Sequence, residues 1–125
     1  MTNNWSEFEN DAYEIVDLGR PAVFLLPSHK LKQSFDGTSV EDDLHHFLSE
    51  RFGAFTSTTA PFSGFWRDHG KRLVYDECRL YEVSFAGKEL VPELMKKLAE
   101  IATRIGEECI YFKAGQYTCL IKPKA

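Results

Sequence analysis

The sequence predicts an α+β fold in which two helices cover one face of an antiparallel sheet. Two amphipathic stretches alternate with short apolar or alternating stretches, in the order strand, helix, strand, strand, helix, strand. This is the βαββαβ order of ferredoxin-like sandwiches, and one more hairpin strand follows it at the C-terminus. A chain of 125 residues, 43% hydrophobic and 27% charged, has the composition of a single globular domain.

Residues 1–19 precede the first clear strand. Trp5, Phe8, Ala12 and Ile15 recur at helical spacing, whereas residues 13–19 also suit a short strand and turn. We expect residues 1–19 to form an N-terminal arm packed on the domain, which spans residues 20–125.

The first strand and first helix have clear sequence signals. The run PAVFLL from Pro21 to Leu26 is apolar throughout, as in a central strand that is buried on both faces. Polar residues 28–37 predict a loop. A capping box, either Thr38 with Glu41 or Ser39 with Asp42, then begins a helix that Gly53 ends.

The second half of the chain repeats this alternation. Residues 54–67 predict an edge strand bent near Pro61 and Gly64, and residues 68–71 predict a hairpin turn before a strand over 73–85. A stripe of Leu and Ile predicts a second helix over 89–105, ended by Gly106. Residues 108–113 and 117–122 predict two strands joined by a tight loop.

One segment resembles a known family. Gly64, Trp66 and Arg67 form a Gly-x-Trp-Arg hairpin, Glu77 opens the next strand as an acidic residue, and Arg104-Ile105-Gly106 end the second helix. Over residues 40–112 this pattern resembles the DUF3574-type family of small bacterial proteins of unknown function. The resemblance implies a compact α+β fold and no assigned activity.

Polar and aromatic residues alternate along the strand predicted over 73–85. Tyr75, Glu77, Arg79 and Tyr81 share one strand face, because side chains alternate with a period of two. Together with hairpin residues Trp66 and Arg67 they are our candidate ligand-binding residues on a helix-free sheet face. The alternative is structural: a Glu77–Arg79 salt bridge between packed rings.

Two other polar groups are interpreted as solvated surface. These are the hairpin-tip residues Asp68 and His69, which follow Trp66-Arg67, and the His45-His46 pair on the first predicted helix. A metal at the histidine pair would need a third ligand, and the sequence marks none.

Several kinds of site are not predicted. The sequence has no phosphate-binding glycine loop, nucleophile elbow or zinc-type cysteine spacing, so we assign no catalytic residue, metal or cofactor.

Cys78, Cys109 and Cys119 are expected to be reduced, buried thiols, as in a cytoplasmic protein. A net charge of −4 argues against nucleic-acid and anionic-membrane partners, and no apolar run is long enough to span a membrane.

The function prediction rests on the strands. PAVFLL places large apolar residues on both faces, whereas two helices cover only one, so something must cover the other. We predict a non-catalytic interaction domain that acts as a homodimer, or with a protein partner, through the helix-free face. The alternative is a small-molecule-binding protein or enzyme with a pocket on that face.

Overall fold

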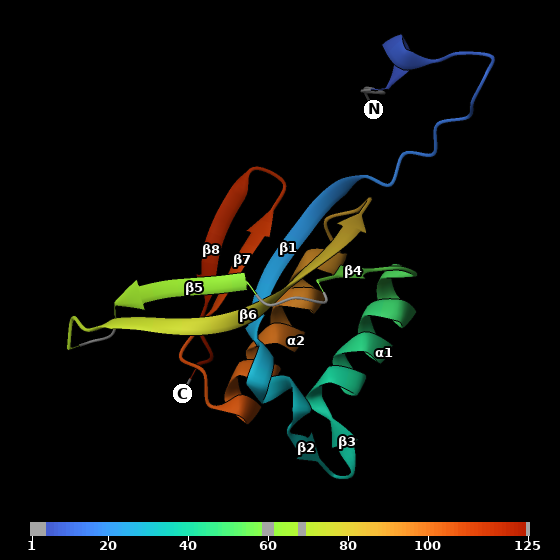
Figure 1. Ribbon diagram of the computed structural model, residues 1–125. Helices are drawn as coiled ribbons and strands as arrows, with labels where there is room; N and C mark the ends of the chain where they lie inside the picture. The colour runs from blue at the N-terminus through green and yellow to red at the C-terminus, as the bar shows by residue number, and fades with distance from the viewer. Residues whose placement is uncertain (1–4, 59–61, 68–69, 125) are drawn as a thin grey trace.

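The computed structural model describes residues 5–58, 62–67 and 70–124. Its main elements are two α-helices and a six-stranded sheet, and a short strand pair lies between β1 and α1 (Figure 1). In chain order the elements are η1 (Ser6–Phe8), β1 (Arg20–Pro27), η2 (Ser28–Lys32), β2 (Ser34–Phe35), β3 (Thr38–Ser39), α1 (Val40–Phe52), β4 (Thr56–Ser57), β5 (Phe62–Arg67), β6 (Leu73–Phe85), α2 (Leu90–Ile105), β7 (Ile110–Ala114) and β8 (Tyr117–Ile121).

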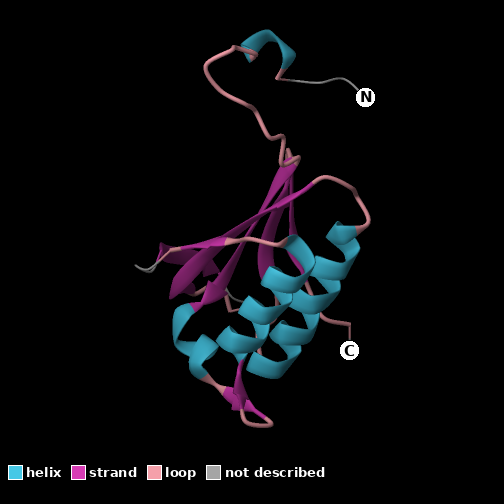
Figure 2. Cartoon of the chain, turned by 90° about the vertical axis from the view of Figure 1, so that its right-hand side faces the viewer, coloured by secondary structure: helices cyan, strands magenta, loops and turns pink. Residues whose placement is uncertain are grey.

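The large sheet has the order β4-β6-β1-β7-β8, and every neighbouring pair is antiparallel. The 13-residue strand β6 pairs with β4 near its end and with β5 along its first half. Both helices lie on one face of this sheet, and the other face carries no helix (Figure 2). The predicted α+β class, with an antiparallel sheet and two helices, is confirmed.

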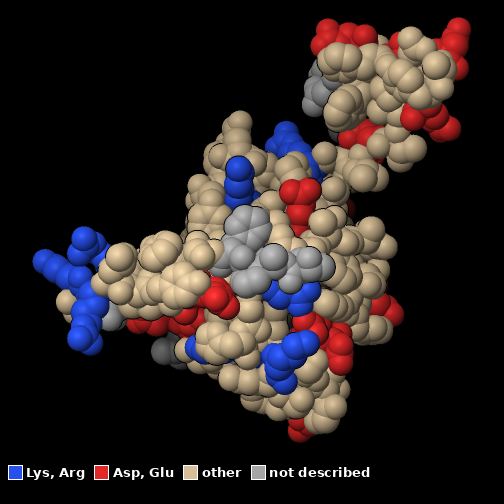
Figure 3. All heavy atoms as spheres, in the orientation of Figure 1, with Lys and Arg blue, Asp and Glu red and all other residues tan. Residues whose placement is uncertain are grey.

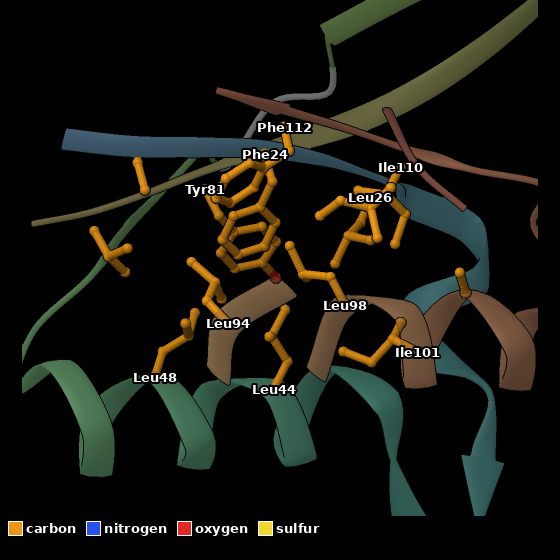
Figure 4. Close-up of a cluster of buried hydrophobic side chains, with 14 of the residues drawn as sticks. Phe24, Leu26, Leu44, Leu48, Tyr81, Leu94, Leu98, Ile101, Ile110 and Phe112 are labelled. Atoms are coloured by element: carbon orange, nitrogen blue, oxygen red, sulfur yellow. The ribbon is translucent and has the colours of Figure 1, made fainter. Parts of the chain in front are cut away.

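The core fills the space between the sheet and the two helices (Figure 4). The central strand β1 places Phe24 opposite Tyr81 of β6 and Phe112 of β7, and the Phe24 and Tyr81 rings stack with centroids 5.2 Å apart. Each large side chain buried in this way contributes roughly 1.5–3 kcal/mol. Leucines of the two helices complete the layer: Leu44, Leu48, Leu94 and Leu98.

The helix ends follow the predicted capping signals. The Ser39 side chain accepts a hydrogen bond from the Asp42 backbone N–H at 3.0 Å, which satisfies one free donor of the first turn. Gly53 and Gly106 end the two helices in left-handed conformations, with φ of 80° and 71°. These conformations carry little cost only for glycine.

The segment before β6 differs from the prediction. Residues 54–67 form two strands, β4 and β5, rather than one bent strand, because β4 pairs with β6 only at Thr56 and Ser57. The predicted bend at Pro61 and the hairpin residues Asp68 and His69 lie outside the described residues. The loop predicted over 28–37 contains η2 and begins the β2–β3 pair.

The N-terminal arm extends from the start of β1, away from the sheet and helices (Figures 1 and 2). Between residues 5 and 19 the side chains are exposed, apart from the half-buried Ile15. The arm contains η1 and a turn in which the Asn10 side chain accepts from the Ala12 N–H at 2.9 Å. Packing of this arm on the domain stays a prediction.

Candidate functional site

A groove of about 480 Å³ lies on the helix-free face of the sheet. The hairpin of β5 and β6 crosses in front of β7 and β8 (Figure 1), and residues of both hairpins line the groove. Its walls include Leu25 of β1, Trp66 of β5, Asp76 and Cys78 of β6, Tyr111 of β7 and Leu120 of β8.

Strand alternation determines which side chains reach this groove. Asp76 and Cys78 point to the side of β6 opposite the buried residues Tyr81 and Val83. Gly64 stands opposite Asp76 in the register, and a Cβ atom there would lie 3.6 Å from the Cys78 Sγ. The glycine therefore leaves space along the groove floor.

Trp66 is the largest ring in the groove. Its indole N–H donates to the Asp76 carboxylate, with Nε1 2.9 Å from Oδ2, across the β5–β6 pair. The side chain remains 39% exposed. A hydrogen bond at one edge limits rotation of the ring, and Trp66 supplies the groove with an aromatic surface.

The charged residues that line the groove are three acids and two bases. Asp76, Glu107 and Glu108 supply carboxylates, and Arg67 and Lys122 supply cations. Glu107 also pairs with Lys30, outside the groove, at 3.5 Å. Aromatic faces beside carboxylates suit a planar ligand that carries a positive charge.

The groove thiols are weak nucleophiles. Burial, and then nearby carboxylates, raise the pKa of both the Cys78 and the Cys109 thiol, so they stay protonated at neutral pH. Cys78 and Cys109 are half-buried, whereas Cys119 is exposed. The prediction of three buried thiols is therefore wrong for Cys119, because β8 is an edge strand.

A second polar cluster lies on the opposite, helix-covered side of β6. The Arg79 guanidinium donates to the Glu41 carboxylate, to the Thr58 carbonyl at 3.2 Å and to the Ser57 hydroxyl at 3.0 Å. Although partial burial raises the pKa of Glu41, Lys32 and Arg79 outweigh it and hold that pKa below its usual value. The cluster joins α1 to the strand segment after β4.

His45 and Tyr81 extend this cluster into the core. The His45 Nε2 and the Tyr81 hydroxyl share a hydrogen bond of 2.9 Å, and Tyr81 is fully buried. Burial lowers the pKa of His45 and raises that of Tyr81, so both groups are neutral at pH 7. With its ring against Phe55 and Tyr81, His45 serves as a packed hydrogen-bond partner.

The structure divides the six candidate residues among three places. Trp66 and Arg67 line the groove. Tyr75 and Glu77 are exposed on the other side of the hairpin, where the Tyr75 hydroxyl donates to Glu77 at 3.2 Å. Arg79 and Tyr81 lie under the helices.

The predicted single pocket is therefore not formed. Tyr75, Glu77, Arg79 and Tyr81 do share one face of β6, but the helices cover that face only at Arg79 and Tyr81, and Tyr75 and Glu77 are exposed. Likewise, the alternative Glu77–Arg79 pair is replaced by an Arg79–Glu41 pair.

Sequence reasoning missed several residues. His45 was interpreted as solvated, although it lies four residues after Glu41, and this spacing places both on one side of α1. Tyr111 and Leu120 also gave a usable signal, because each has a buried neighbour in its strand, whereas both neighbours of Asp76 are exposed. His46, in contrast, is exposed as predicted and pairs with Glu50 at 3.5 Å.

The described part of the chain has neither a metal-binding cluster nor a membrane-spanning helix. Within residues 5–58, 62–67 and 70–124, no three His, Cys, Asp or Glu side chains are grouped so that they could hold a metal ion. In the same ranges no helix is both long enough and apolar enough to cross a membrane.

Comparison with known proteins finds likeness only among solved structures. No protein-family model and no curated protein matches the chain. A phage SAM lyase in complex with S-methyl-5′-thioadenosine is 13% identical, with a TM-score of 0.57 over 88% of this chain and 94% of that one. A phage SAM lyase in the apo state is also 13% identical, with a TM-score of 0.61 over 90% and 97%.

At 13% identity this likeness shows a shared fold. It contradicts the prediction of a non-catalytic interaction domain, because the fold is one used by an enzyme solved with a small molecule. It favours the alternative prediction, a small-molecule-binding protein or enzyme. The DUF3574-type resemblance stays a prediction.

Proposed function

We propose that this chain is an enzyme that binds S-adenosylmethionine, or a close adenosyl relative, in the groove on the helix-free face. The observation that carries this proposal is the Trp66 ring, held by Asp76 inside a groove that also contains carboxylates. The fold shared with the phage SAM lyase supports the choice of ligand.

The groove suits the chemistry of this ligand. The adenine ring stacks on Trp66 or Tyr111, and such stacking contributes roughly 1–3 kcal/mol per base. Carboxylates accept hydrogen bonds from ribose hydroxyls and attract the positive sulfonium group. When a carbon–sulfur bond of a sulfonium breaks, its electron pair stays on sulfur, so no acid is needed to protonate the leaving thioether. The carboxylate of the same ligand forms a carbon–oxygen bond to the carbon that loses sulfur, which closes a lactone without a further reactant.

The thiols do not take part in this proposal. Cys78 and Cys109 are protonated at neutral pH because burial raises the pKa of each, so neither attacks the substrate. The groove supplies binding, orientation and a negative electrostatic field instead.

Calorimetric titration with S-adenosylmethionine tests the proposal, with chromatography of the incubated mixture to detect S-methyl-5′-thioadenosine. Trp66→Ala should weaken binding by about tenfold or more, since it removes the stacking surface. Tyr75→Ala is the matched control, because Tyr75 lies on the same hairpin but faces away from the groove. Absence of binding by the unaltered chain would reject the proposal.

Three finer predictions belong to this proposal. The order β7-β1-β6-β4, with a helix after β1 and another after β6, supports a ferredoxin-like classification with β8 added at the edge. We also propose that a second copy covers the helix-free face as a homodimer, supported by exposed Tyr111 and Leu120. Three free thiols support a reducing, cytoplasmic location.

A further inference from the structure

Exposed large apolar side chains are concentrated in two segments, the N-terminal arm and the β5–β6 hairpin. Among the described residues, twelve such side chains are exposed, and nine lie on either the N-terminal arm or the β5–β6 hairpin. They are Trp5, Phe8, Tyr13, Val16 and Leu18 of the arm, and Phe65, Trp66, Leu73 and Tyr75 of the hairpin. Contiguous exposed apolar surface of this kind marks interaction sites.

The arm and the tip of the hairpin, residues 67–72, have opposite net charges. Residues 5–19 contain five Asp or Glu and no Lys or Arg. In contrast, residues 67–72 contain Arg67, Lys71 and Arg72 and one acid, Asp68. Figure 3 shows the acidic side chains gathered over the arm and basic side chains at the hairpin tip, at opposite ends of the molecule.

The arm also contains a surface pocket. A space of about 480 Å³ is lined by the Trp5 and Tyr13 rings and by carboxylates of Glu9, Asp11 and Glu14. Aromatic faces and carboxylates around one space suit a guanidinium or an ammonium group. The Tyr13 hydroxyl donates to the Phe8 carbonyl, and this bond holds one wall in place.

We propose that the acidic arm of one copy of this chain binds the basic tip of the β5–β6 hairpin of a second copy. Complementary charge and apolar surface favour the contact, and the separation of the two segments in Figure 1 favours a contact between molecules. In a two-fold dimer both contacts form, because each arm reaches the other hairpin. The inference does not depend on the ligand proposed above.

This contact would reach the groove. Trp66 and Arg67 belong to the hairpin and also line the groove, so an arm bound there borders the ligand site. The arm of the second copy would then cover part of the groove, which is open to solvent in a single chain.

A charge-swap experiment tests the contact by light scattering. One variant carries Glu9→Lys, Asp11→Lys and Glu14→Lys, and the other carries Arg67→Glu, Lys71→Glu and Arg72→Glu. The unaltered chain should have about twice the 14.3 kDa chain mass, and each variant alone should have the single-chain mass. A one-to-one mixture should recover the double mass, because each altered segment then meets its complement.

The control is a variant with Lys88→Glu and Lys96→Glu, two exposed lysines near and on α2, which should behave as the unaltered chain. Raising the salt to about 1 M should weaken association of the unaltered chain at least tenfold without any substitution, since screening is then nearly complete.

Three results would overturn the inference: the unaltered chain is monomeric, either variant associates as strongly as the unaltered chain, or the mixture stays monomeric. Loss of ligand binding with association intact would reject only the proposed function.

Discussion

Arg79 shows how one side chain joins three elements. Its guanidinium contacts Glu41 of α1, Ser57 of β4 and the Thr58 carbonyl, and it lies 5.6 Å from the centre of the Tyr81 ring. The side chain is 22% exposed, so water screens these contacts only in part. The residue therefore fixes α1 against the strand edge rather than binding a ligand.

Arg79→Ala should destabilise the fold by about 2 kcal/mol, because it leaves the half-buried Glu41 with Lys32 but without Arg79, and it removes the bonds to Ser57 and Thr58. Thermal melts should show a loss of about 8 °C for a domain of this size. Arg51→Ala is the control: its partner Glu93 is 46% exposed, so the loss should stay below about 1 kcal/mol.

Double substitutions identify the partner of Arg79. Glu41→Ala added to Arg79→Ala should recover part of the lost stability, whereas Glu77→Ala added to it should recover none. Recovery with Glu77→Ala instead would show that the pair predicted from the sequence is the real one.

His45 makes the stability of the fold depend on pH. Burial holds its folded pKa below the ordinary value of 6.5, partly opposed by Glu41 and assisted by Arg79. The unfolded chain therefore binds the proton more readily, so stability is complete above about pH 6.5 and is lost as pH falls through the folded pKa.

Melting temperatures between about pH 8 and pH 5 should show this loss in the unaltered chain. His45→Gln, which does not titrate, should have a flatter profile over the same window. The lowered pKa of Glu41 causes a separate loss below its ordinary value of 4.5, so the two effects are distinguishable. Identical slopes for both chains would contradict the assignment.

At the scale of elements, the start of β1 depends on one glycine. Gly19 has a φ of 89°, and a Cβ atom there would lie 2.1 Å from the Phe85 carbonyl oxygen. Since that contact involves backbone atoms of β6, no side chain can move to relieve it. Gly19 therefore allows β1 to begin directly beside the end of β6.

Gly19→Ala should cost about 3 kcal/mol or more, which combines the left-handed conformation with displacement of the β1–β6 pair. Gly53→Ala is the matched control, because Gly53 has a φ of 80° with nothing within 4 Å of the added Cβ. That control should lose only about 1 kcal/mol. Urea denaturation of the two variants measures the difference, and equal losses would refute the backbone clash.

At the scale of the whole molecule, the two faces of the sheet have different roles. The helix-covered face contains the core and the Arg79 and His45 contacts, whereas the helix-free face carries the groove. A ligand in that groove contacts β1, both hairpins and the segment before β7 together. Ligand binding should therefore stabilise the whole domain.

S-adenosylmethionine at a hundred times its dissociation constant should stabilise the fold by about 2.7 kcal/mol. For a domain of this size that corresponds to a rise in melting temperature of about 10 °C. The Trp66→Ala chain, if it binds tenfold more weakly, should show about half that rise at the same ligand concentration. An equal rise in both chains would place the ligand outside the groove.

The sequence by itself determined both helices and the longer strands, but not the division of residues 54–67 into β4 and β5. The Ser39 cap, Gly53 and Gly106 marked the helix ends, and period-two alternation marked β6, because these signals arise from local backbone geometry. PAVFLL likewise predicted the central strand β1. Trp66 and Arg67 were proposed as site residues because they belong to the predicted hairpin, and both line the groove.

Only the tertiary structure decided which face each residue joins. Alternation shows that Arg79 and Tyr81 share a face but does not show that α1 covers it. The groove itself exists because the β5–β6 hairpin crosses β7 and β8, so Asp76 and Leu120, far apart in sequence, line one space. The path of a long hairpin and the side on which helices pack depend on contacts between distant residues, which local periodicity does not encode.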